Sequence, residues 1–155
     1  MKSVLDISVS AFSNYHSTSP KDVNLLTWLY SDKYADKVLA IRELSDKKER
    51  DKIKATLPAV TPGGTFSERR ATGLINHSGL LQFDVDGVQD IKTTKQKICS
   101  LPNVAYCGLS VSGRGLWGLI PIVEPAHHKQ YFEFIQKAFA SMGIIIDESC
   151  KDVSR

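Results

Sequence analysis

The stretch HSGLLQFDVDG, residues 77–87, decides the fold, because apolar and polar side chains alternate along it. The alternating run is Leu81-Gln82-Phe83-Asp84-Val85-Asp86. Successive side chains of a β-strand point to opposite faces of the sheet. We therefore expect a strand with one buried apolar face, and with two carboxylates roughly 6–7 Å apart on the opposite face.

Five further elements are predicted after this strand, from their periodicity and their breakers. Apolar spacing and a following proline or glycine mark helices, and runs that end at glycine mark strands. In chain order they are a helix at 90–102, strands at 104–113 and 116–122, a helix from 125 to 143 and a short strand at 144–147. The order β-α-β-β-α-β is typical of a ferredoxin-like or RRM-like sheet, with both helices on one face and the other face free for chemistry.

The first 70 residues are expected to form a smaller α/β extension. They contain a strand from Val4 to Ala11, a helix starting at Ser19, a charged helical region over 32–56 and a loop over 57–70 that is rich in proline and glycine. The predicted class is therefore α+β. It has an N-terminal extension over residues 1–70 and an RRM-like core over 71–155, together forming a single domain that is truncated at its C-terminus.

Length and composition fit one globular domain. The chain has 155 residues, 42% of them hydrophobic and 24% charged, with a net charge of +3 that is too weak to indicate a nucleic-acid partner alone. No apolar run reaches the ~18 residues of a membrane span. The three cysteines form no CxxC pair, which favours reduced thiols and a cytoplasmic protein.

The predicted chemistry is a divalent-cation site. Asp84 and Asp86 repel each other on one strand face, and Mg²⁺ or Mn²⁺ bound by their oxygen atoms relieves that repulsion. Asp147 follows the run Ile144-Ile145-Ile146 and supplies a third carboxylate if that strand lies beside the first.

A phosphate site is predicted at the turn that follows the second strand of the core. Ser110, Ser112, Gly113 and Arg114 bring hydroxyls, backbone N–H groups and a guanidinium, which suit a triphosphate. Three carboxylates, two metal ions and a phosphate cradle are what nucleotidyl transfer requires.

Three segments carry a family resemblance: LPAVTPGGTFSERR…HSGLLQFDVDG, LSVSGRGLWGLIPI and IIIDESCKDVSR. They resemble the VirE N-terminal domain family, which is grouped with the archaeo-eukaryotic primase (primase–polymerase) superfamily. The resemblance implies that Asp84 and Asp86 form the first catalytic motif and Asp147 the third. The second motif, Ser-x-His, lacks its histidine here, and Arg114 stands in for the phosphate contact.

The function implied by the resemblance is a primase-like nucleotidyltransferase domain of a mobile-element or phage replication protein. The implied partners are a nucleotide triphosphate, a single-stranded DNA template and a downstream ATPase or helicase region. Expected nucleic-acid contacts are Arg69, Arg70, Lys151 and Arg155.

Two alternatives remain open at this point. A primase fold without catalysis, which binds nucleic acid and recruits a downstream ATPase, accounts for the missing histidine. A HAD-like phosphatase is similar at LLQFDVDGV, where Asp84 is the nucleophile and Asp86 the acid/base. The predicted β-α-β-β-α-β order favours the nucleotidyltransferase over the phosphatase.

Overall fold

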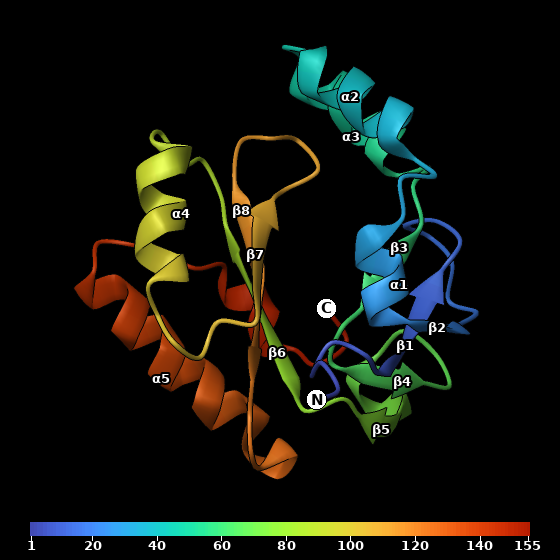
Figure 1. Cartoon of the computed structure of the whole chain (residues 1–155). Coiled ribbons are helices and arrows are strands. Elements are labelled where there is room, and N and C mark those ends of the chain that lie inside the picture. Colours follow the sequence, from blue (N-terminus) through green and yellow to red (C-terminus); the bar gives the residue numbers. More distant parts are fainter.

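The computed structural model describes residues 1–155 and shows an α+β fold with three small antiparallel sheets and five α-helices (Figure 1). The predicted α+β class is confirmed. None of the helices is both long and apolar enough to cross a membrane.

The first sheet has the order β2-β1-β3, with strands β1 (Ser8–Phe12), β2 (Lys21–Asn24) and β3 (Ala59–Thr61). The helix predicted to start at Ser19 is wrong, because Lys21–Asn24 pairs with β1 as a strand. Helix α1 (Leu25–Tyr30) starts only after Asn24, whose side chain accepts a hydrogen bond from the Thr27 N–H. Asparagine is a strong N-cap, and this local signal lies five residues beyond the predicted one.

The predicted charged helical region is confirmed as two helices, α2 (Ala35–Glu43) and α3 (Lys47–Lys54). The chain breaks between them, and the Asp46 carboxylate caps α3 by accepting from the Glu49 N–H at 2.9 Å. Only Ile41 of α2 is buried, and α3 buries no residue. Both helices therefore keep most of their charged side chains in solvent.

The loop predicted over 57–70 is partly wrong, since it contains strand β3 and strand β4 (Gly64–Phe66). Strand β4 pairs with β5 (Leu74–His77) in a two-stranded sheet. Phe66 is 2% exposed, and its N–H donates to the buried Ser10 hydroxyl at 2.8 Å. Burial of β4, and pairing of β3 with the distant strand β1, therefore override the local effect of the glycines and prolines.

The third sheet has the order β6-β8-β7, with strands β6 (Leu80–Val85), β7 (Tyr106–Leu109) and β8 (Leu116–Pro121). Helices α4 (Ile91–Cys99) and α5 (His128–Ser141) cover one face of it (Figure 1). The predicted alternation in β6 is confirmed, because its apolar positions pack in one cluster with residues of both helices. The β6 members of that cluster are Leu81, Phe83 and Val85, and the helix members include Ile98, Phe132, Ile135 and Phe139.

The short strand predicted at 144–147 does not form. This segment runs beside β6 and makes one backbone hydrogen bond there, from the Asp147 N–H to the Asp84 carbonyl at 2.8 Å. Asp147 then turns the chain by capping a short 3-10 helix, Glu148–Lys151. The pairing between residues 144–147 and β6 therefore ends after one backbone hydrogen bond.

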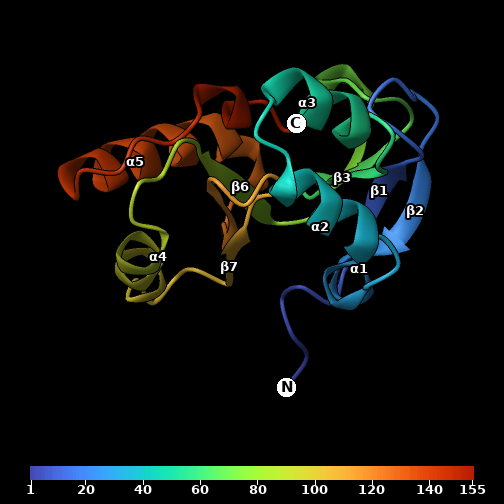
Figure 2. The ribbon, with the colours of Figure 1, turned by 90° about the horizontal axis from the view of Figure 1, so that it is seen from above.

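The second face of the β6-β8-β7 sheet is not free as predicted. Leu80 and Leu119 from this sheet pack against Leu5, Val9 and Leu25 of the N-terminal part. Seen from above, α2 and α3 lie on the side of the sheet away from α4 and α5 (Figure 2). The N-terminal unit therefore covers one end of this face, and the acidic end of β6 lies at the border of the covered region.

Candidate functional site

Asp84 lies near the end of β6 and is half-buried. Its Oδ1 atom is buried and has no hydrogen-bond partner. Burial, and after it the negative charge of Asp86, raise the pKa of Asp84 to about 6, although the Lys54 charge works in the opposite direction. A buried carboxylate without a partner is energetically unfavourable in its charged form, so this position favours a cation or a proton.

Asp86 is exposed just beyond the end of β6. Its charge and that of Asp147 both act on Asp84, so the structure brings the three predicted carboxylates into one neighbourhood.

Asp147 differs from the other two because its carboxylate already has partners. It accepts from the Ser149 N–H at 2.9 Å and from the Arg155 guanidinium at 3.3 Å. Burial alone would raise the pKa of Asp147, but these hydrogen bonds and the Arg155 charge bring it below its usual value. No group of three or more His, Cys, Asp or Glu side chains is arranged to hold a metal ion. The geometry thus leaves Asp84 and Asp86 as the pair that is free to bind a cation.

The predicted phosphate turn lies directly beside this pair. The N–H of Gly115 donates to the Ser110 hydroxyl at 3.1 Å, and the Ser110 and Ser112 hydroxyls are 3.3 Å apart. A Cβ atom at Gly115 would collide with the Val85 carbonyl oxygen, so only glycine lets the turn approach β6 this closely. The turn therefore places two hydroxyls next to the acidic end of β6.

Arg42 is a functional candidate that the sequence did not identify. It reaches from α2 to the turn and donates from Nη2 to the Ser110 carbonyl at 3.2 Å. Its Nε atom is buried and has no partner. The small basic excess over residues 32–56 was the only sequence signal. Arg114 is exposed and donates to the Leu44 carbonyl at 3.4 Å, so both guanidiniums lie between the turn and the end of α2.

Three of the four predicted nucleic-acid contacts, Arg70, Lys151 and Arg155, are paired with acidic side chains. Arg70 pairs with Glu68, and Lys151 pairs with Glu133 at 2.5 Å. Arg69 and Arg155 line a common pocket, where Arg69 also lies over the rings of Phe12 and Tyr15.

A histidine pair is a second feature that was not predicted. The Gly79 N–H donates to Nδ1 of His77, so His77 carries its proton on Nε2 and donates to Nδ1 of His128 at 2.9 Å. This series of hydrogen bonds leaves the Nε2 proton of His128 buried and without a partner. Burial lowers the pKa of both histidines, that of His128 to about 4, and so favours the neutral forms.

Comparisons with known proteins correct the resemblance stated above. No curated protein and no solved structure matches the chain. Residues 52–155 match the family described as BT4734-like, N-terminal domain, which is a different family from the VirE N-terminal domain. The assignment to the VirE family, and with it to the primase superfamily, is therefore wrong. The match covers more than half of the chain, which therefore belongs to the family BT4734-like, N-terminal domain.

Proposed function

We propose that this domain binds a nucleotide triphosphate through a divalent cation, Mg²⁺ or Mn²⁺, and transfers the nucleotidyl group onto nucleic acid. One observation carries the proposal. A buried carboxylate oxygen of Asp84 and a buried guanidinium nitrogen of Arg42 both lack partners, and the turn Ser110–Gly115 lies between their two elements. A cation bound to triphosphate supplies a positive partner for the first atom and a negative partner for the second.

The residues present fit such a cation. Mg²⁺ usually keeps several waters and is bound by one or two carboxylates together with substrate phosphates. Asp84 and Asp86 are sufficient for that arrangement, and Asp147 is not needed as a third ligand. The bound cation would neutralise charge that develops on the phosphates during the transfer.

The other side chains have distinct roles in this proposal. Arg42 and Arg114 bind phosphate oxygens from the N-terminal side. The Ser110 and Ser112 hydroxyls donate hydrogen bonds to phosphate oxygens from the turn. In the transfer, the attacking 3′-hydroxyl loses its proton to solvent, and its oxygen forms a bond to the α-phosphorus. The bond from that phosphorus to the bridging oxygen breaks, and pyrophosphate leaves.

The finer fold assignment, an RRM-like sheet, is part of the proposal. Its support is the element order β6-α4-β7-β8-α5 and the sheet order β6-β8-β7. The hydrogen bond from Asp147 to Asp84 places the final segment beside β6, where the fourth strand of such a sheet would run. The antiparallel pairing is also unlike the parallel sheet of a long alternating α/β fold, which disfavours the HAD-like phosphatase.

The test is ligand-dependent thermal stability, because a ligand that binds only the folded state raises Tm. We expect Mg²⁺ or Mn²⁺ together with ATP to raise Tm, and the double variant Asp84→Ala/Asp86→Ala to abolish the rise. Asp51→Ala, an exposed carboxylate on α3, is the matched control and should keep the full rise. A rise that survives the double substitution would refute the proposed cation site.

A second candidate is nucleic-acid binding without catalysis. The observation that favours it is the pocket that Arg69 and Arg155 line together, where two guanidiniums can contact phosphates away from the aspartate pair. This candidate predicts that a labelled single-stranded oligonucleotide binds equally well with Mg²⁺ or with EDTA, with affinity that falls as salt rises. It also predicts no primer extension by the domain when Mn²⁺, template and nucleotides are supplied.

A further inference from the structure

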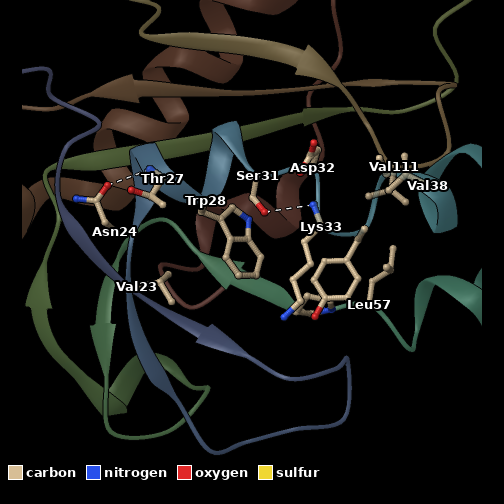
Figure 3. Close-up of a pocket in the computed structure, with 13 residues that line it drawn as sticks. Val23, Asn24, Thr27, Trp28, Ser31, Asp32, Lys33, Val38, Leu57 and Val111 are labelled. Carbon is tan, nitrogen blue, oxygen red and sulfur yellow. Dashed lines mark hydrogen bonds between the residues drawn. The ribbon is translucent and has the colours of Figure 1, made fainter.

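A pocket lies on the N-terminal side of the turn Ser110–Gly115, separate from the aspartate pair. Its volume is about 690 Å³, within the range of small-molecule sites. Figure 3 shows the Trp28 ring in the middle, with Val38, Val111 and Leu57 on one side and Val23 on the other. The pocket therefore has an aromatic ring at its centre, apolar side chains on both sides of that ring and polar side chains, among them Asp32 and Lys33, in the rest of its lining.

Three separate segments connect this pocket to the proposed phosphate and cation site. On α2, Val38 lines the pocket and Arg42, one helical turn later on the same face, contacts the turn. In the turn, Val111 lines the pocket, while its chain neighbours Ser110 and Ser112 carry the hydroxyls.

The third connection is the end of α3. Lys54 places its charge close enough to oppose the raised pKa of Asp84, and Leu57 follows three residues later and lines the pocket. A ligand whose charged group binds at the turn would therefore have its uncharged end next to this pocket.

The side chains that line the pocket indicate which chemical group the uncharged end of the ligand is. Two of the polar side chains at the rim are already used, because Asn24 accepts from the Thr27 N–H and donates to Asp6, and the Ser31 hydroxyl accepts from the Lys33 N–H. The charged side chains of Asp32 and Lys33 also line the pocket, and both residues are exposed to solvent. What remains inside the pocket is the half-buried indole of Trp28, the half-buried ring of Tyr34 and aliphatic side chains. Such a surface recognises a flat ring by stacking rather than by a pattern of donors and acceptors.

We infer that the pocket takes the base of the bound nucleotide, stacked against Trp28, while its phosphates lie at the turn. This inference rests on the proposed function and adds the position of the base to it. Since every base has a stacking face, the pocket accepts all four bases, and purines bind more tightly because they stack over a larger area.

The experiment compares ATP with inorganic tripolyphosphate, each with Mg²⁺, by calorimetric titration. Trp28→Ala should weaken ATP binding about 5- to 150-fold, the range expected for loss of one stacked base, and leave tripolyphosphate binding unchanged. Tyr30→Ala is the matched control, since Tyr30 lies on the same helix but is 83% exposed and outside the pocket, and it should change neither affinity.

A second variant keeps the test valid if Trp28→Ala fails to fold. Val23→Phe fills the pocket from the β2 wall and should also weaken ATP binding while sparing tripolyphosphate. Equal binding of ATP and tripolyphosphate to the unaltered protein, or ATP binding unchanged in both variants, would overturn the base pocket and leave the phosphate site intact. Absence of binding by both ligands would overturn the proposed function and the base pocket together.

Discussion

Replacing Asp84 with asparagine should stabilise the fold at neutral pH, although Asp84 is a proposed ligand of the cation. The pKa of Asp84 rises from 3.8 to about 6, mainly because of burial and then because of Asp86. A carboxyl group with a raised folded-state pKa favours the folded state most when it is protonated, below the unfolded pKa of 3.8. That advantage is lost as pH rises through about 4 to 6, so the charged form destabilises the protein at pH 7.

The magnitude follows from the shift. About two pKa units at about 1.4 kcal/mol each give ~3 kcal/mol as an upper limit. Asp84 is partly open to solvent, which screens the charge, so we expect about 1–2 kcal/mol of stabilisation from Asp84→Asn at pH 7.

The assay is urea unfolding of Asp84→Asn and the unaltered protein at pH 7 and pH 4, without divalent ions. The difference in unfolding free energy should be largest at pH 7 and should shrink at pH 4, where the native carboxyl is protonated. Asp51→Asn is the control, because Asp51 is exposed on α3 and its charge is not among those that shift the pKa of Asp84, and it should stay within about 0.5 kcal/mol of the unaltered protein. Destabilisation by Asp84→Asn of more than about 1 kcal/mol at pH 7 would refute the reasoning, since it would mean that the charged form has partners inside the protein.

Three further predictions concern other parts of the fold. The folded-state pKa of His128 is lowered to about 4, so the stability that its neutral form contributes is fully present above pH 6.5 and should fall by up to about 3 kcal/mol as pH drops to 4. His128→Gln should flatten that part of a plot of urea-unfolding free energy against pH. An unchanged plot would contradict the buried neutral pair. Gly115→Ala should lower the unfolding free energy by about 2 kcal/mol or more because its Cβ meets the Val85 carbonyl oxygen, and a variant as stable as the parent in urea would contradict this close approach. At pH 8 a thiol reagent should modify the exposed Cys99 first, because burial raises the pKa of the other two thiols to about 11 and about 12; mass spectrometry of the modified peptides would contradict this if Cys107 or Cys150 reacted first.

The parts of the fold that the sequence predicted are those set by short-range periodicity. The two-residue alternation of β6 was sufficient to separate Phe83, which is fully buried against Phe139, from Asp84 on the other face. The helical spacing after Pro125 likewise predicted α5 and its buried Ile135, although the structure buries Phe132 and leaves Phe134 71% exposed.

The parts that were wrong depend on partners far away in the chain. Lys21–Asn24 is a strand because β1 lies beside it, and nothing within the segment itself indicates that pairing. The 144–147 segment has a β-like composition, but the Asp147 side chain caps the next turn and ends the ladder. The sequence therefore predicted that Asp147 comes close to Asp84, but not that Arg155 pairs with it.

Within the candidate site, the two aspartates could be predicted from the sequence, and the arginine that α2 contributes could not. Asp84 and Asp86 stand out because charge interrupts an apolar strand. Arg42 is one of many charged residues on a solvated helix, and only the contact with Ser110, across 68 positions of sequence, distinguishes it. The histidine pair is similar, since His77 and His128 are 51 positions apart.

The family match, over residues 52–155, leaves out part of the candidate site. The matched residues start at 52, inside α3, so they include Lys54, the turn and all three carboxylates. Arg42 and Trp28, which the proposals assign to the phosphates and the base, lie before the match. The same preceding segment also supplies Leu5, Val9 and Leu25, which cover Leu80 and Leu119 on the second face of the main sheet.

Removing residues 1–51 would therefore expose apolar sheet surface and remove part of the site at the same time. It would also take β1 away from β3, which would lose its only partner strand. The two effects have one structural cause, because the N-terminal unit packs on the sheet through its leucines and reaches the turn through α2. In the proposed function, residues 1–51 therefore supply one wall of the site, through Arg42 and Trp28.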